Sequence, residues 1–263
     1  MTAAGVRTWL LRGWVTLVFA FLMLPVVVIV LASLSRTSYL TVPPRGLTLT
    51  WFTRVLSDPE YVHAIGWSVA LALVATAGSL GAGIAASFAL VRRRVVGGAG
   101  IAALLNAPLV FPGVVVGVAL LQFFALIHLN GTFVGLALAH MVITVPYVVR
   151  AVTASLQGID PELENAARVL GASGPVAFFA VTLPLIRPGV AAGALFSFIV
   201  SFDNVPVSIF LLGAGQMTLP VKIFTAIEYG VDPSIAAIST LLIVVTGIGL
   251  AVAERWIGFH RFV

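Results

Sequence analysis

The sequence predicts an all-α, polytopic membrane protein with six transmembrane helices. Of its 263 residues, 60% are hydrophobic and only 9% are charged, and the apolar residues fall in long uncharged runs. A soluble domain carries about 25% charged residues, so such a chain could not cover its apolar surface in water. This composition excludes an ordinary soluble enzyme, a nucleic-acid binder and a disordered scaffold. The continuity of the runs excludes the alternating pattern of an outer-membrane barrel.

Six apolar runs approach the length of about 20 residues that a helix needs to cross roughly 30 Å of hydrocarbon. They cover residues 13–34, 65–91, 101–126, 133–149, 188–212 and 235–253. The first run is too long for the apolar part of a signal peptide, and no Ala-x-Ala cleavage site follows it. We therefore expect an uncleaved anchor and a single transmembrane domain over residues 1–263.

The basic residues predict that both termini are cytoplasmic. In this orientation, the outside loops hold only Arg36, Arg45, Arg54 and Lys222 of the 14 Lys and Arg residues. The strongest cytoplasmic signal is the cluster Arg92-Arg93-Arg94 at the end of the second run. The net charge of +5 therefore reflects membrane topology and does not indicate a nucleic-acid partner.

The pattern Pro-Leu-x-x-Pro-Gly-Val-x-x-Gly occurs twice, at residues 108–117 and 184–193. Proline is tolerated in the first turn of a helix and disrupts its interior, so each copy marks a helix start or break. The small residues that follow allow close helix packing. Two explanations stay open, a remote duplication and a shared mechanical need.

The chemistry that the sequence lacks limits its function. There is no Gly-x4-Gly-Lys-Ser/Thr phosphate loop, no cysteine and no cluster of His and carboxylate residues with metal-ligand spacing. We therefore expect no enzyme activity, metal or cofactor on this chain. His63, His128 and His260 fall at predicted membrane interfaces, where we expect solvated side chains. His140 falls in the fourth run, where we expect a hydrogen bond to a neighbouring helix.

The longest cytoplasmic loop, residues 150–187, contains a short amphipathic helix. Asp160 is expected to cap it with Pro161 in the first turn, and Glu162 and Glu164 suit the positive helix start. One apolar face is formed by Leu163, Ala166, Ala167 and Leu170. Such a small face suits a groove of another protein, which we favour, or a position on the lipid surface.

The same loop resembles the Glu-Ala-Ala loop of binding-protein-dependent ABC permeases. The matching residues are Asn165-Ala166-Ala167, then Gly171 after three intervening residues, then Val181-Thr182-Leu183-Pro184 after nine more. Asn165 replaces the family's Glu and Val181 replaces its Ile. The resemblance implies a permease domain in which Asn165, Ala166, Ala167, Gly171, Leu183 and Pro184 couple to a cytoplasmic ATPase subunit that holds ATP and Mg²⁺.

Asp203 is an acidic residue inside the fifth predicted run. A carboxylate at that depth is energetically unfavourable and usually faces a cavity or a partner. We favour a counter-ion for a cationic substrate. The alternative is a buried aspartate that is protonated or paired with a polar group of a neighbouring helix, in this or another subunit.

The segment around Asp203 resembles the spermidine/putrescine class of ABC permeases, most closely their second permease subunit. The resemblance rests on Ser201-Phe-Asp-Asn-Val-Pro-Val-Ser-Ile-Phe, Leu219-Pro-Val-Lys-Ile-Phe, His140-x5-Pro146-Tyr-Val-Val-Arg150 and Tyr229-Gly-Val-Asp-Pro-Ser234. It implies a substrate pathway lined by Ser201, Phe202, Asp203 and Asn204. The implied partners are a second permease, two ATPases and a soluble substrate-binding protein outside a bacterial inner membrane.

Two other functions stay open. Permeases for iron, opines, amino-acid derivatives and phosphonates share much of this pattern. A self-sufficient secondary transporter or channel could use Asp203 as a proton or ion site, although such proteins often carry inverted repeats and the repeat here is parallel.

Overall fold

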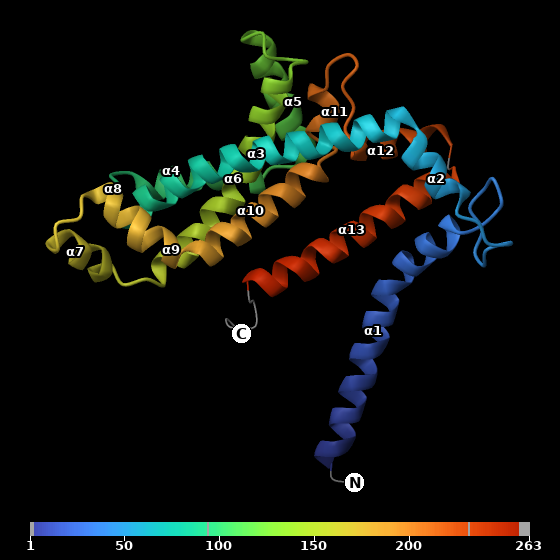
Figure 1. Ribbon diagram of the computed structural model, residues 1–263, viewed down its shortest axis with the longest axis horizontal. Helices are drawn as coiled ribbons and strands as arrows, with labels where there is room; N and C mark the ends of the chain where they lie inside the picture. The colour runs from blue at the N-terminus through green and yellow to red at the C-terminus, as the bar shows by residue number, and fades with distance from the viewer. Residues whose placement is uncertain (1–2, 94, 231, 258–263) are drawn as a thin grey trace. The chain divides into compact units, whose positions relative to one another are not determined.

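The computed structural model describes residues 3–93, 95–230 and 232–257, which form helices joined by short connections (Figure 1). Within these ranges, the one strand-like pairing is an isolated bridge between Ser35 and Leu47. The all-helical fold class is thereby confirmed. The predictions made for Arg94 and His260 fall outside the described residues.

The chain forms two compact units, Met1–Val62 with Ile223–Val263, and His63–Lys222. In the first unit, α13 (Pro233–Ile257) contacts both α1 (Ala3–Ser33) and α2 (Thr50–Ser57). Helix α2 lies in the outside connection predicted between the first two apolar runs. The connection from α1 to α2 is held by hydrogen bonds, such as that from Trp51 Nε1 to the Ser35 carbonyl at 2.8 Å.

The second unit contains most of the predicted functional residues. Helix α3 (Pro59–Arg92) enters it from the first unit, and α12 (Leu219–Tyr229) leaves it. Between them lie α4 (Gly98–Asn106), the 3₁₀ turn η1 (Ala107–Leu109), α5 (Gly113–Leu126), α6 (Phe133–Gln157), α7 (Glu162–Val169), α8 (Gly174–Ala177), the π-helical turn η2 (Phe178–Thr182), α9 (Leu183–Leu185), α10 (Arg187–Phe202) and α11 (Ser208–Leu211).

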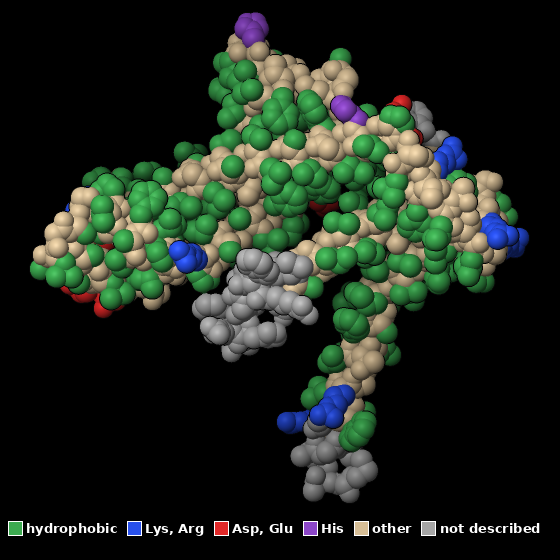
Figure 2. Space-filling model, viewed as in Figure 1, with side chains coloured by type: hydrophobic (Ala, Val, Ile, Leu, Met, Phe, Trp, Pro, Cys, Tyr) green, Lys and Arg blue, Asp and Glu red, His purple; other side chains and the backbone are tan. Residues whose placement is uncertain are grey.

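By length and composition, α1, α3 and α6 can each cross a membrane. Two bent pairs, 98–109 with 113–126 and 174–185 with 187–202, raise the number to five, and 233–249 of α13 is a shorter apolar helix. Figure 2 shows hydrophobic side chains exposed along the helices of the face drawn, as lipid contact requires. Each predicted run contains helix, but the third and fifth runs, which we expected to be single spans, are interrupted.

The third run bends by 106° between Leu109 and Gly113. Pro112 has extended backbone angles there, and proline disfavours helical geometry in the residue before it. The predicted span at 101–126 is therefore a bent pair made of α4 with η1, and α5.

The fifth run ends as a helix at Phe202 and resumes at Ser208. In the gap, the Asn204 side-chain oxygen accepts the Val207 N–H at 2.9 Å, and Pro206 has no N–H to donate. Such local side-chain bonding competes with the helix, so the predicted continuous span at 188–212 is wrong. Other boundaries of the predicted runs differ as well: α1 begins at Ala3, α3 begins at Pro59, and α6 continues past Val149 to Gln157. The connection between the fifth and sixth predicted runs, expected to lie outside, contains the helix α12.

Helix α10 packs on α6 through a stripe of small, buried residues four apart: Gly189, Gly193, Ser197 and Ser201. A Cβ atom on Gly193 would lie 3.1 Å from Val148 Cα, and one on Gly189 would lie 2.7 Å from the Ala151 carbonyl oxygen. The two backbones therefore approach each other as closely as helices with small-residue interfaces allow.

The repeated Pro-Leu-x-x-Pro-Gly-Val-x-x-Gly pattern coincides with the two bends of 106° and 73°. In both copies the two glycines lie against another segment. Gly113 and Gly117 face Pro206, whereas Gly189 and Gly193 face α6. A shared mechanical need, a bend followed by close packing, accounts for the pattern without a duplication.

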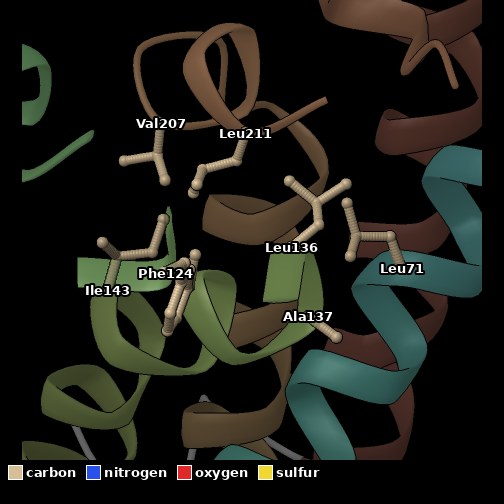
Figure 3. Close-up of a cluster of buried hydrophobic side chains, with 8 residues drawn as sticks. Leu71, Phe124, Leu136, Ala137, Ile143, Val207 and Leu211 are labelled. Atoms are coloured by element: carbon tan, nitrogen blue, oxygen red, sulfur yellow. The ribbon is translucent and has the colours of Figure 1, made fainter. Parts of the chain in front are cut away.

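Apolar side chains from four helices form the core around the break after α10 (Figure 3). Val207 and Leu211 pack with Phe124 of α5, Leu136 of α6 and Leu71 of α3. The short helix α11 is therefore fixed by apolar burial although it has only one turn.

We expect Gly189→Ala to weaken the α6–α10 contact, because its Cβ would overlap Ser155 and the Ala151 carbonyl. Overpacking of this kind lowers the free energy of unfolding by about 1–3 kcal/mol. Thermal unfolding of the purified chain in detergent measures the effect. Gly66→Ala in α3, with no atom within 4 Å of its Cβ, is the matched control. Equal melting temperatures for the two variants would contradict the close-packing argument.

Candidate coupling and translocation sites

The predicted docking helix exists as α7, between α6 and α8. Asp160, which was predicted as the cap, bonds the start of this helix, because its Oδ1 accepts the Glu162 N–H at 2.9 Å. However, the helix begins at Glu162, and the N-cap position is occupied by Pro161 rather than Asp160. Gly171, with φ +98°, ends it, and the N–H groups of Gly171 and Ala172 return to the carbonyls of the last turn. This is the left-handed C-terminal cap that glycine favours.

None of the α7 residues is buried in this chain. Leu163 is 49% and Leu170 is 89% exposed, so most of the apolar face predicted for this helix is uncovered within the described chain. Ala166 is exposed and Ala167 is half-buried. Asn165 is exposed as well, and its amide donates to Glu162 Oε1 at 3.2 Å along the same helix.

Leu183 and Pro184 lie away from α7, in the junction that leads into α10. Both are half-buried, and Leu183 packs against a buried cluster that includes Val152 and Ile186. The structure thus separates the predicted coupling residues into two groups, Asn165, Ala166, Ala167 and Gly171 on or next to α7, and Leu183 and Pro184 at the base of α10.

Helix α7 contacts this junction, and among the described residues one side-chain hydrogen bond, which was not predicted, joins the two. The Thr182 hydroxyl, which is buried in the π-helical turn η2, donates to Glu164 Oε2 at 3.2 Å. π-Helical turns are rare and often occur at functional sites. The two residues are 18 positions apart, and neither has a sequence signal that would have paired them.

Asp203 caps the C-terminus of α10, where the helix breaks. Its side chain is exposed, and no hydrogen bond or ion pair to its carboxylate occurs within the described part of the chain. The other predicted pathway residues differ in burial. Ser201 is buried, whereas Phe202 and Asn204 are half-buried.

His140 confirms the expected hydrogen bond to a neighbouring helix. Its Nδ1 lies 2.8 Å from Ser201 Oγ of α10, and its Nε2 lies 3.0 Å from Ser208 Oγ of α11. His63 and His128 are exposed, as predicted, and His63 also stacks on Trp67. Among the described residues, no three His, Cys, Asp or Glu side chains are grouped so that they could hold a metal ion.

Bent and broken apolar helices, with the exposed amphipathic helix α7 between them, are typical of a polytopic membrane subunit. Residues 77–259 match the model of a protein family described as the binding-protein-dependent transport system inner membrane component. The chain belongs to this family, so it is a permease subunit of an ABC importer, and ATP is hydrolysed on a separate partner.

Several curated relatives align with most of the chain. The putrescine transport system permease protein PotI of Escherichia coli (strain K12) is 34% identical over 88% of this chain and 84% of its own length. The spermidine/putrescine permease PotC of Haemophilus influenzae is 31% identical over 91% and 93%. The molybdenum transport system permease ModB of the same species is 32% identical over 73% and 92%.

A solved structure has the same fold. A bacterial ABC transporter involved in the import of the acidic polysaccharide alginate contains a chain with a TM-score of 0.78, covering 97% of this chain and 98% of its own. The identity is 15%, so this likeness shows the fold alone.

Proposed function

We propose that this permease subunit forms half of the translocation path for a small, polyamine-like cation. The main observation that supports this substrate class is the 31–34% identity of the chain, over most of its length, to permeases named for putrescine and spermidine. The relative named for molybdenum transport aligns over less of the chain, and a solute of another class is the alternative that the experiment must exclude. A secondary transporter or channel is disfavoured by the family.

Asp203 is our candidate for the residue that attracts the cation. Its carboxylate is exposed and has no polar partner in the described chain. It also caps the C-terminus of α10, where the helix dipole is negative and favours a cation. In a path of low dielectric constant, the attraction between unit charges is several times stronger than in water. Ser201, Phe202 and Asn204 would shape the same part of the path.

We propose that α7 enters a cleft of a cytoplasmic ATPase that holds ATP and Mg²⁺. Its apolar face is exposed, and the small side chains of Ala166 and Ala167 permit close approach. Asn165 and Gly171 would flank the contact. Leu183 and Pro184 would pass the movement of α7 to α10, helped by the contact between Glu164 and Thr182.

The complete importer would contain a second permease, which we expect to be a paralogue, two ATPases and a soluble substrate-binding protein. The family places the chain in an inner membrane, and we propose that both its termini are cytoplasmic. The binding protein would then meet the segments at 35–63 and 213–233.

We expect Asp203→Asn to lower polyamine uptake about tenfold or more, because it removes the charge and keeps the size and hydrogen-bonding capacity. Asp203→Glu should retain part of the uptake. The measurement is radiolabelled putrescine uptake by the reconstituted complex, with complex yield and ATPase activity as controls. Wild-type uptake by the Asn variant would refute the charge role, and loss of the complex would identify an assembly residue.

Ala167→Asp should leave the chain inserted but abolish substrate-stimulated ATPase activity, because a carboxylate on the small face would lose hydration in the cleft. Ala167→Ser, which keeps the side chain small and uncharged, is the matched control and should retain most of the activity. Stimulated activity in the Asp variant equal to that of the Ser variant would exclude α7 as the docking element.

A reporter fused near Arg93 or Gly174 should indicate the cytoplasm, and one near Arg45 or Met217 the outside. The basic residues predict this orientation. Paired cytoplasmic and periplasmic reporters at each position provide the measurement. An outside location for Gly174 would make ATPase docking impossible.

A further inference from the structure

We propose that His140 is a positioning residue that holds the two sides of the α10–α11 break together and thereby fixes the segment at 203–206. This inference deepens the proposed function, which assigns Asp203 in that segment to the substrate. His140 is completely buried on α6. One ring nitrogen bonds Ser201, in the last turn of α10, and the other bonds Ser208, the first residue of α11. A single imidazole therefore spans the break.

The hydroxyl groups assign the direction of each bond. Ser208 has one hydroxyl proton, which it donates to the Asn204 carbonyl at 2.6 Å. Its oxygen must therefore accept from His140 Nε2–H. Nδ1 then accepts from the Ser201 hydroxyl, so a single ring proton, on Nε2, satisfies the whole arrangement.

Further hydrogen bonds connect the backbone of His140 to helix α3. Thr144 Oγ1 donates to the His140 carbonyl at 2.7 Å, and the Ser79 hydroxyl of α3 lies 2.7 Å from Thr144 Oγ1. All four side chains of this path, those of Ser79, Thr144, His140 and Ser201, are buried. Hydrogen bonds in such a setting are strengthened by the low dielectric constant and hold a unique geometry.

The bridge adds side-chain hydrogen bonds to a segment that is otherwise held by the Asp203 N–H bond to the Ile199 carbonyl and by the apolar burial of Val207. The Asn204 carbonyl accepts from Ser208 and the Asn204 side chain accepts the Val207 N–H. The Asp203 side chain has no polar contact in the described residues, so the position of its carboxylate is set by its backbone alone. His140 never touches the exposed carboxylate, but through Ser208 it fixes the backbone that carries it.

Hydrogen–deuterium exchange of the assembled complex in lipid nanodiscs tests this without any substrate. We expect Ser201→Ala to raise exchange of the amides in 203–207 roughly fivefold, the effect of losing one hydrogen bond worth about 1 kcal/mol. Ser79→Ala is the matched control, since it removes a buried hydroxyl of the same path but leaves both bonds of the imidazole. Unchanged exchange in Ser201→Ala, or an equal rise in the control, would overturn the proposal.

A second variant, at His140 itself, distinguishes loss of the imidazole bridge from a general loss of stability of the chain. His140→Gln can still donate to Ser208 from its terminal amide but is too long to replace Nδ1, so it should match Ser201→Ala. The double variant should then exchange no faster than either single variant, because both remove the same bond. Additive increases would overturn the bridge.

Measuring putrescine transport by the same complexes shows whether a failure concerns the role of His140 or the proposed substrate. We expect Ser201→Ala to lower putrescine uptake per ATP hydrolysed, and Ser79→Ala to preserve it. A wild-type complex that moves no polyamine would overturn the substrate proposal, whereas the exchange experiment would still decide the role of His140.

Discussion

The close approach of α10 to α6 is the constraint on which the rest of the second unit depends. Within a lipid bilayer the hydrophobic effect does not drive apolar helices to associate, so van der Waals packing and hydrogen bonds must hold them together. Gly189 and Gly193 allow the backbones to meet, and this brings Ser201 within 2.8 Å of the His140 ring. With larger side chains in the stripe, the imidazole could not reach α10.

Hydropathy predicted the apolar helices because the requirement for about 20 apolar residues is independent of tertiary structure. It could not predict the two interruptions, since an apolar run looks the same whether the helix is straight, bent or broken. Local signals existed: the pattern with Pro108 and Pro112 predicted a helix start or break and lies at one bend, and Asn204 with Pro206 marks the break after α10. Helix α12 was missed because Lys222 and Glu228 interrupt its apolar character.

The candidate coupling helix was predictable, because the signals for its start and its end lie within a dozen residues of one another. The contacts that join it to the rest of the chain were not. Thr182 meets Glu164 across 18 residues, and His140 meets Ser201 and Ser208 across 61 and 68. The sequence predicted that His140 would bond a neighbouring helix, since an unpaired polar group in an apolar span is unfavourable. Its partners are determined by the α6–α10 packing.

The two ends of α10 explain why a broken helix suits the proposed coupling. Helix α10 has 16 residues and is stiff and about 24 Å long. A displacement of its N-terminal end at Arg187 is therefore transmitted to its C-terminal end at Phe202, unless a flexible segment lies between. At the base, Ile186 is fully buried against Val148 and Val152, which limits movement within the bend. At the tip, the His140 bridge holds the break to α6. A push on α7 would therefore move α10 and α6 as one body, and Asp203, at the end of that body, would move with them.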